Sequence, residues 1–323
     1  MSSPPSSPPP PIDDDILALG ERIMKFDALI NERMSSGTII SADEELMDRA
    51  VHVKHACWKL NEFCNEMWIN GVIGVTFTGK QKSDEGVEGT KVQYDLRSEP
   101  AQTRTCFYAV DVIEAAKWHL AWLTDTKVFI DSATVDMEFD AGLMIEPRTF
   151  RVKHLNISVQ TNYTSIHGWL QHVDPGVESF IFRGNGILNA NKLLTNPFVS
   201  KLKKLMIVYE SSFDDRTLNL LTAEHIQLAS DFVTDHGINR MLHRWNDEDY
   251  PIRSTFVIYM QVNSADRILA GMNVQETVHS EIFAEVSEHL IQMKNPDKRM
   301  RLICRTSSVI CTVFAVDNSI AEK

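Results

Sequence analysis

The feature that most constrains the fold of this 323-residue chain is a recurring six-residue pattern with apolar residues at its first, fourth and sixth positions. Four segments share it: residues 152–157, 177–182, 202–207 and 223–228. Their fourth positions are residues 155, 180, 205 and 226, and the steps of 25, 25 and 21 residues fit the spacing at which a strand and a helix form one leucine-rich repeat. Because one such unit cannot bury its apolar face alone, the strands are expected to stack into a parallel sheet with helices outside.

Further copies and connecting helices extend this pattern. Val177, Phe180, Phe182, Asn185 and Ile187 fit the longer leucine-rich consensus with its asparagine at the strand exit. Weaker copies lie at residues 127–130 and 254–258, and helical runs lie at 111–123, 165–173, 189–194, 216–221 and 235–245. Residues 111–323 are therefore predicted to form an α/β domain, an irregular leucine-rich-repeat-like solenoid with a parallel sheet. An unrelated α/β domain rich in leucine would contain some such matches by chance, and that alternative stays open.

The region before residue 111 divides into three parts. Residues 1–12 are almost entirely Ser and Pro, which predicts a disordered tail. In residues 13–70, apolar side chains recur at steps of three and four, and residues 41–44 read as a capping box, so we expect a helical hairpin. Residues 71–110 hold short β-type runs around a glycine-containing loop and are predicted to form a small β segment.

The part of the chain after the repeats is less regular. The apolar spacing predicts an amphipathic helix over residues 279–293. Residues 301–304 and 309–316 are predicted to be strands. Such a hairpin would cover the last edge of an open parallel sheet.

Side chains of the predicted strands should form columns on the sheet face that the helices leave uncovered, because successive residues of a strand point to opposite sides. The middle column is Phe129, Asn156, Ile181, Met206 and Gln227. The flanking columns are Lys127, His154, Ser179, Lys204 and His225, and Asp131, Ser158, Arg183, Val208 and Ala229. The residues predicted to bind a partner are Phe129, His154, Asn156, Ile181, Arg183, Lys204, Met206, His225 and Gln227. The alternative is that loops of the chain itself cover this face.

Charge and composition narrow the class of partner. With 44 acidic and 32 basic side chains, the formal charge of −12 disfavours nucleic acid and anionic membranes. A basic cluster of Lys294, Lys298, Arg299, Arg301 and Arg305 suits an anionic protein or a solvated turn. Five cysteines without a C-x-x-C pair predict reduced thiols in an intracellular, cytoplasmic or nuclear protein. The sequence has no apolar run of the roughly 20 residues that a membrane span needs.

The sequence contains two near-matches to functional motifs, and each lacks a feature that its chemistry requires. Residues 74–80 nearly spell a phosphate-binding loop, but Gln81 replaces the hydroxyl residue that would hold magnesium. His52, His55, Cys57 and Cys64 suggest zinc, yet on a helix these four side chains would not converge on one ion. We therefore predict no catalytic, cofactor or metal site.

The repeat region resembles a known family. Residues 167–182, HGWLQHVDPGVESFIF, resemble the repeat core of nematode F-box-associated proteins of the FTH type, in which a short helix, a D-P turn and a leu-glu-ser-ile strand recur. Residues 238–245 and 249–252 resemble the helix and turn near the end of that family's domain. The resemblance covers roughly residues 110–320 and implies a substrate-recognition subunit of a cullin-type ubiquitin ligase, docked to a Skp1-like adaptor. The leucine-proline opening of an F-box is missing, so residues 13–70 are either a degenerate F-box or an unrelated hairpin.

These observations lead to one main hypothesis about function. The chain is expected to be a non-enzymatic protein-interaction module that presents the open face of its sheet to another protein. The alternative is an enzyme on an α/β fold whose site is assembled from distant residues and leaves no motif.

Overall fold

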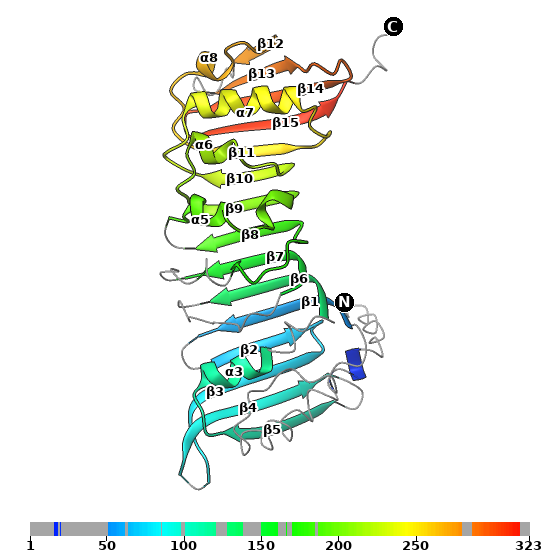
Figure 1. Ribbon diagram of the computed structural model, residues 1–323, viewed down its shortest axis with the longest axis vertical. Helices are drawn as coiled ribbons and strands as arrows, with labels where there is room; N and C mark the ends of the chain where they lie inside the picture. The colour runs from blue at the N-terminus through cyan, green and yellow to red at the C-terminus, as the bar shows by residue number, and fades with distance from the viewer. Residues whose placement is uncertain are drawn as a thin grey trace, which may run out of the picture. The chain divides into compact units, whose positions relative to one another are not determined.

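The computed structural model describes residues 16–18, 20, 51–61, 64–84, 86–97, 101–120, 128–137, 150–160, 166, 170–184, 187–279 and 286–316. The chain divides into two compact units, residues 1–151 (unit 1) and residues 152–323 (unit 2). In the described part of each unit, strands predominate and the helices are short (Figure 1). The protein is therefore a sheet-dominated mixed α/β protein. The predicted disordered tail at residues 1–12 lies outside the described residues.

Unit 1 is built on a mixed sheet with the strand order β6-β1-β2-β3-β4-β5. Its elements are β1 (Val51–Leu60), β2 (Cys64–Ile69), β3 (Ile73–Lys82), β4 (Glu88–Leu96), β5 (Gln102–Tyr108), α3 (Val112–Leu120) and β6 (Val128–Met137). β1 and β6 run parallel, whereas the pairs from β1 to β5 are antiparallel. Alternate residues Val75, Phe77, Val92 and Tyr94 are buried, as expected for strands with one covered face.

The second helix of the predicted N-terminal hairpin is wrong, because residues 51–60 and 64–69 are strands. The start of β1 also alternates apolar and polar residues, with Val51 and Val53 buried and His52 and Lys54 exposed. A segment with both periodicities is decided by its tertiary partners, and here β2 and β6 pair with it on either side. Of the first predicted helix, Ile16, Leu17, Ala18 and Gly20 are helical, and the rest of it lies outside the described residues.

Two other expectations for unit 1 can be judged. The predicted helix at residues 111–123 is present as α3 over Val112–Leu120. The segment predicted to be a small β region contains β3, β4 and β5, which belong to a larger sheet than expected. The near-match to a phosphate loop at residues 74–80 lies inside β3, where the backbone is extended and cannot wrap around a phosphate.

Unit 2 begins with five parallel strands that lie side by side in sequence order: β7 (Val152–Val159), β8 (Ser179–Gly184), β9 (Lys204–Glu210), β10 (His225–Ala229) and β11 (Thr255–Tyr259). The fourth positions of the predicted pattern are in register, since Leu155, Phe180, Leu205 and Ile226 are successive partners and Phe256 follows. The prediction of stacked parallel strands is therefore confirmed for these segments. Whether the ladder belongs to a leucine-rich solenoid stays a prediction.

Four antiparallel strands complete the sheet of unit 2, so this sheet is mixed rather than parallel throughout. β15 (Ser308–Ala315) pairs with β11, and β14 (Lys298–Arg305), β13 (Ser287–Gln292) and β12 (Val274–His279) follow outward. The predicted hairpin at residues 301–304 and 309–316 is confirmed as β14 and β15, and β15 covers the edge of the last parallel strand.

The predicted helix over residues 279–293 is wrong. His279 ends β12, and β13 occupies residues 287–292, while residues 280–285 lie outside the described residues. The spacing of Leu290 and Met293 is compatible with a helix, but His289, Ile291 and Met293 are buried alternately, which is the period of a strand. Pairing with β12 and β14 satisfies the β13 backbone and decides in favour of the strand.

Short helices cover one face of the unit 2 sheet (Figure 1). They are α5 (Ala190–Leu194), the 3-10 helix η1 (Val199–Lys201), α6 (Asp215–Leu218), α7 (Asp235–Asp247) and α8 (Ala265–Ile268). The four α-helices among them begin at side-chain caps; at α6, Asp214 forms a capping box with Thr217. Trp245 of α7 stacks on Tyr250 at 4.5 Å and meets Phe256 edge-on at 5.1 Å, which fixes this helix over β11.

The helices expected at residues 189–194 and 235–245 are confirmed, and the one expected at 216–221 is present as the shorter α6. Most of the helix expected at residues 165–173 lies outside the described residues. The face that these helices cover is lined mainly by buried apolar side chains, whereas the opposite face of the unit 2 sheet carries most of its polar side chains.

Candidate functional site

The face of the unit 2 sheet opposite the helices, called here the open face, carries the predicted middle column in register. Its central row runs through Asn156, Ile181, Met206, Gln227, Val257, Ile310 and Ile303, each opposite the next on a neighbouring strand. All seven side chains are half-buried. The sequence placed Asn156, Ile181, Met206 and Gln227 correctly relative to one another, because one shared register follows from the equal position of each strand in its repeat.

A second row of the open face consists of polar side chains. It runs through His154, Ser179, Lys204, His225, Thr255, Thr312 and Arg301, again from strand to neighbouring strand. His154 and His225 are exposed, and Lys204 is half-buried. The hydroxyls of Thr255 and Thr312 lie 3.5 Å apart across β11 and β15. This row confirms the register predicted for His154, Ser179, Lys204 and His225.

The third predicted column is interrupted. Ser158 and Arg183 are partners as expected, but the register between β9 and β10 shifts: β9 uses extra residues between Met206 and Glu210, so that Ala229 lies opposite Glu210 instead of Val208. A bulge re-aims the side chains of a strand and increases its local twist. Arg183 donates a hydrogen bond of 2.5 Å from Nη1 to Oδ1 of Asn156, which holds its guanidinium close to the central row.

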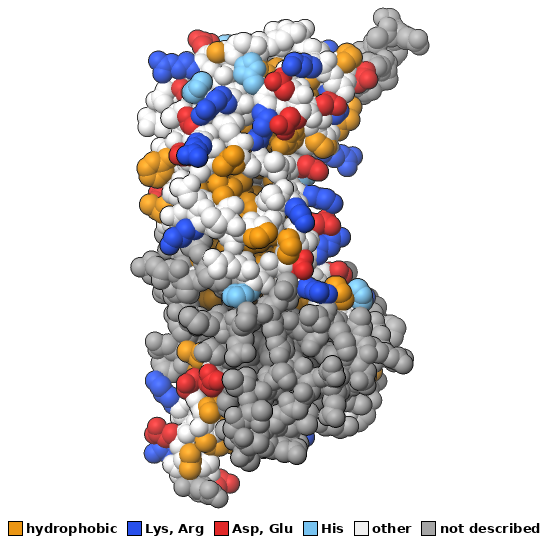
Figure 2. All heavy atoms as spheres, in the orientation of Figure 1, with side chains coloured by type: hydrophobic (Ala, Val, Ile, Leu, Met, Phe, Trp, Pro, Cys, Tyr) orange, Lys and Arg blue, Asp and Glu red, His pale blue; other side chains and the backbone are white. Residues whose placement is uncertain are grey.

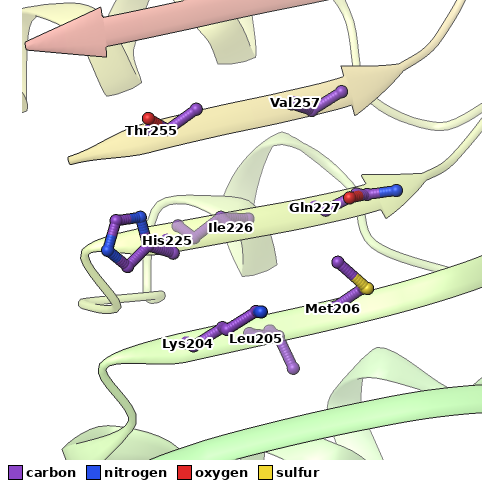
Figure 3. A pocket seen from close by; sticks show the side chains of 8 residues that line it. All are labelled: Lys204, Leu205, Met206, His225, Ile226, Gln227, Thr255 and Val257. Carbon is purple, nitrogen blue, oxygen red and sulfur yellow. The ribbon is translucent and has the colours of Figure 1, made fainter. Parts of the chain in front are cut away.

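A depression of about 260 Å³ lies where β9, β10 and β11 meet on the open face. Lys204, His225 and Thr255 line one end of it, and Met206, Gln227 and Val257 line the other (Figure 3). Leu205 and Ile226 also contribute, and since their side chains are buried, their backbone forms the floor. A volume at or below the small end for ligand sites suits one inserted apolar side chain better than an enclosed small molecule.

Sequence reasoning did not place in these rows the residues that β11, β15 and β14 contribute. Thr255 and Val257 lie in the segment recognised as a weaker repeat copy, so extending the columns by one strand would have identified them. Ile310 and Ile303 join the central row through antiparallel pairs, between β11 and β15 and between β15 and β14. The repeat spacing does not predict such pairs, because they connect segments that share no sequence pattern.

Phe129, also predicted to bind a partner, lies on β6 of unit 1. There it is opposite His52, whose ring stacks on it at 5.4 Å, and the Arg151 guanidinium lies 5.2 Å from its ring centroid. His52, His55 and Cys57 lie on a strand rather than the expected helix. Within the ranges that the structure describes, no group of three or more His, Cys, Asp or Glu residues could hold a metal ion.

The predicted basic cluster divides between the two sides of the sheet. Lys294 and Lys298 form ion pairs with Asp247 and Asp249, at 2.8 and 2.9 Å, next to the end of α7. On this helix-covered side, basic and acidic side chains alternate closely (Figure 2). Arg299, Arg301 and Arg305 alternate with the buried residues of β14 and therefore belong to the open face.

Two cations of the open face differ in whether they have an ion-pair partner. Arg301 donates to both carboxylate oxygens of Glu288, at 2.7 and 2.8 Å, and this contact lowers the pKa of Glu288. Lys204 has no ion-pair partner among the described residues. Its ammonium group is therefore available to a carboxylate from another molecule.

The buried thiols of unit 2 lie on the covered side of the sheet. Burial raises the pKa of Cys304 to about 12, and it raises that of Cys311 further. Thiols with raised pKa values stay protonated at neutral pH and are poor nucleophiles. These two cysteines therefore act as core side chains.

Comparison of the chain with protein-family models, curated proteins and solved structures finds no match. The resemblance to F-box-associated proteins therefore rests on the quoted residues alone. In the described part of the chain, no helix combines the length and apolar character needed to cross a bilayer.

Proposed function

We propose that this chain is a non-enzymatic protein-binding module whose contact surface is the open face of unit 2. The observation that carries the proposal is the central row, in which Ile181, Met206, Val257, Ile310 and Ile303 are half-buried on a sheet face that no described helix covers. Apolar side chains bordered by polar and charged groups are the composition of a protein interface. The row thus supplies apolar contact area, and its neighbours supply specificity.

The dimensions of the row favour a macromolecule over a small ligand. Ile181 and Ile303 are separated by five steps between neighbouring strands, or about 24 Å at the usual strand spacing. The depression of about 260 Å³ on this face covers three of these strands. A partner that contacts the whole row must therefore be longer than a small metabolite.

The proposal includes the role that the family resemblance implies, substrate recognition for a cullin-type ubiquitin ligase, as a separate point to test. A Skp1-like adaptor would have to dock through residues 13–70, and that segment contains β1 and β2. Removing it would delete paired strands of unit 1, so the test is capture of a purified Skp1-like adaptor by the full chain. Lack of adaptor binding would remove the ligase role and leave the interaction proposal standing.

The open-face proposal is tested with two variants that introduce the same charge at different places. Met206→Glu puts a carboxylate in the central row, whereas Leu220→Glu puts one at an exposed position after α6. We expect a partner captured by the parent chain and by Leu220→Glu to be lost with Met206→Glu, and the contact to be reproduced with purified components. A purified partner that binds both variants equally would contradict the proposal.

A further inference from the structure

Building on the proposed function, we propose that the occupant of the open face is an amphipathic helix with acidic flanks, contributed by a partner protein. The helix would lie along the central row, with its apolar stripe on Ile181, Met206 and Val257 and its carboxylates toward the cations on either side. Three properties of the face, namely its backbone chemistry, its spacing and its charge, point to this occupant.

The backbone chemistry favours a helix over an extended segment. The peptide groups of β8, β9, β10, β11, β15 and β14 are paired with neighbouring strands on both sides. An extended segment laid over this face could not use them, so its own amides and carbonyls would be buried over apolar side chains without regular partners. A helix satisfies its backbone internally and needs only side-chain contacts. The other face of the same sheet already packs helices in this way.

The spacing of the row matches a helix. Neighbouring strands lie about 4.8 Å apart, which is close to the pitch of about 5.4 Å per helical turn. Apolar side chains three and four residues apart on a helix can thus meet successive members of the row. The separation from Ile181 to Ile303 of about 24 Å corresponds to a helix of roughly 16 residues. The depression between Met206, Gln227 and Val257 would receive the largest apolar side chain of the helix.

The charge of the face is opposite to that of the chain. The fixed charges of the described open face are the cations Arg183, Lys204, Arg299, Arg301 and Arg305 and the carboxylates Glu210, Glu276 and Glu288. Cations are thus in excess on this face, although the whole chain carries a formal charge of −12. Lys204 lies on one side of the central row and Arg183 on the other. Acidic residues on both flanks of a partner helix would meet them.

The test is selection of a random peptide library displayed on phage against the full-length chain. Sequences that also bind the Met206→Glu variant are discarded, and the remaining peptides are synthesised. We expect them to be acidic, with apolar residues at steps of three and four, and to gain helical circular dichroism when bound. Lys204→Glu should weaken binding of these peptides about tenfold or more. The same charge reversal at Lys201, an exposed residue of η1 on the helix side, should leave binding unchanged.

The outcomes separate this inference from the function on which it rests. Peptides that need Met206 but are basic, or that alternate apolar and polar residues and stay extended, would overturn the helix and keep a protein-binding open face. A selection in which every enriched peptide binds Met206→Glu as well as the parent, or in which none is enriched, would overturn both. Unfolding of each variant is followed by circular dichroism, so that loss of binding is not confused with loss of structure.

Discussion

Phe180 and Ile181 are consecutive residues of β8, yet they belong to two regions with different chemistry. Phe180 is fully buried on the covered face, where it meets the ring of Phe198 edge-on at 5.6 Å. Ile181 is half-buried in the central row of the open face. Helices of the same unit pack on the covered face, whereas no described helix packs on the open face. The apolar residues of the open face therefore lack the helix contacts that bury the residues of the covered face.

The largest expected effect tests this difference within one strand. Phe180→Ala should lower the free energy of unfolding by about 3–5 kcal/mol, because it removes a buried ring and leaves a cavity. Ile181→Ala should lower it by about 1 kcal/mol, since its side chain is only partly removed from water. Denaturant unfolding of both variants measures the contrast. Equal losses would mean that the open face is packed as tightly as the covered face.

A smaller effect is expected at the capping box that begins α6 on the covered side. The Thr217 hydroxyl and the Thr217 backbone amide each donate a hydrogen bond of 2.7 Å to Oδ1 of Asp214, and these bonds lower the pKa of its carboxyl. Asp214→Ala should cost about 1 kcal/mol of unfolding free energy. A carboxyl group whose pKa is lower in the folded state stabilises the fold at pH values above its unfolded-state pKa of about 3.9. This stabilisation is lost as the pH falls through the folded-state pKa. The difference between parent and Asp214→Ala should therefore shrink as the pH falls below 4.

His289 provides a pH-dependent test in the antiparallel part. It is buried on the covered face of β13, with ring nitrogens 3.0 Å from the Thr277 hydroxyl and 2.9 Å from the Ser287 hydroxyl. Burial, followed by the nearby His279, lowers its pKa, while Asp266 and Glu288 oppose that shift. Because the pKa of His289 is lower in the folded state, its contribution to stability is fully present above the unfolded-state pKa of about 6.5. The contribution is lost as the pH falls below that value.

The melting temperature of the parent should thus fall between pH 7.5 and 5.5 by more than that of His289→Gln. His279→Gln, at an exposed position on β12, is the matched control and should keep most of the parent's pH dependence. A parent and a His289→Gln variant with the same slope against pH would show that this ring does not control the response.

The smallest effect is expected at Lys204 on the open face. Because no ion-pair partner is recorded for it among the described residues, Lys204→Gln should change the free energy of unfolding by no more than about 0.5 kcal/mol. Denaturant unfolding at low and at moderate salt measures this. A loss well above that limit would mean that Lys204 serves the fold and is not held for a partner.

The parallel and antiparallel parts of unit 2 differ in how far the sequence predicted them. The positions of Leu155, Phe180, Leu205 and Ile226 follow from a spacing that can be counted, because each parallel strand returns through a similar connection. β12 and β13 have no such period, and the apolar residues of that segment also fit a helix. The helix predicted over residues 51–69 was wrong for the same reason, since this segment forms β1 and β2. Short apolar segments with two compatible periods are assigned by their neighbours.

The sequence by itself determined the parallel ladder, its register from Asn156 to Gln227, and the side of the strands on which Lys204 and His225 would lie. It could do so because alternation along a strand and spacing between repeats are local properties of the chain. Tertiary structure alone decided that Ile310 and Ile303 extend the central row, that extra residues in β9 pair Ala229 with Glu210, and that Phe129 lies opposite His52 in unit 1. Each of these depends on which distant segment supplies the pairing partner, and that choice is made by burial and backbone hydrogen bonding of the whole sheet.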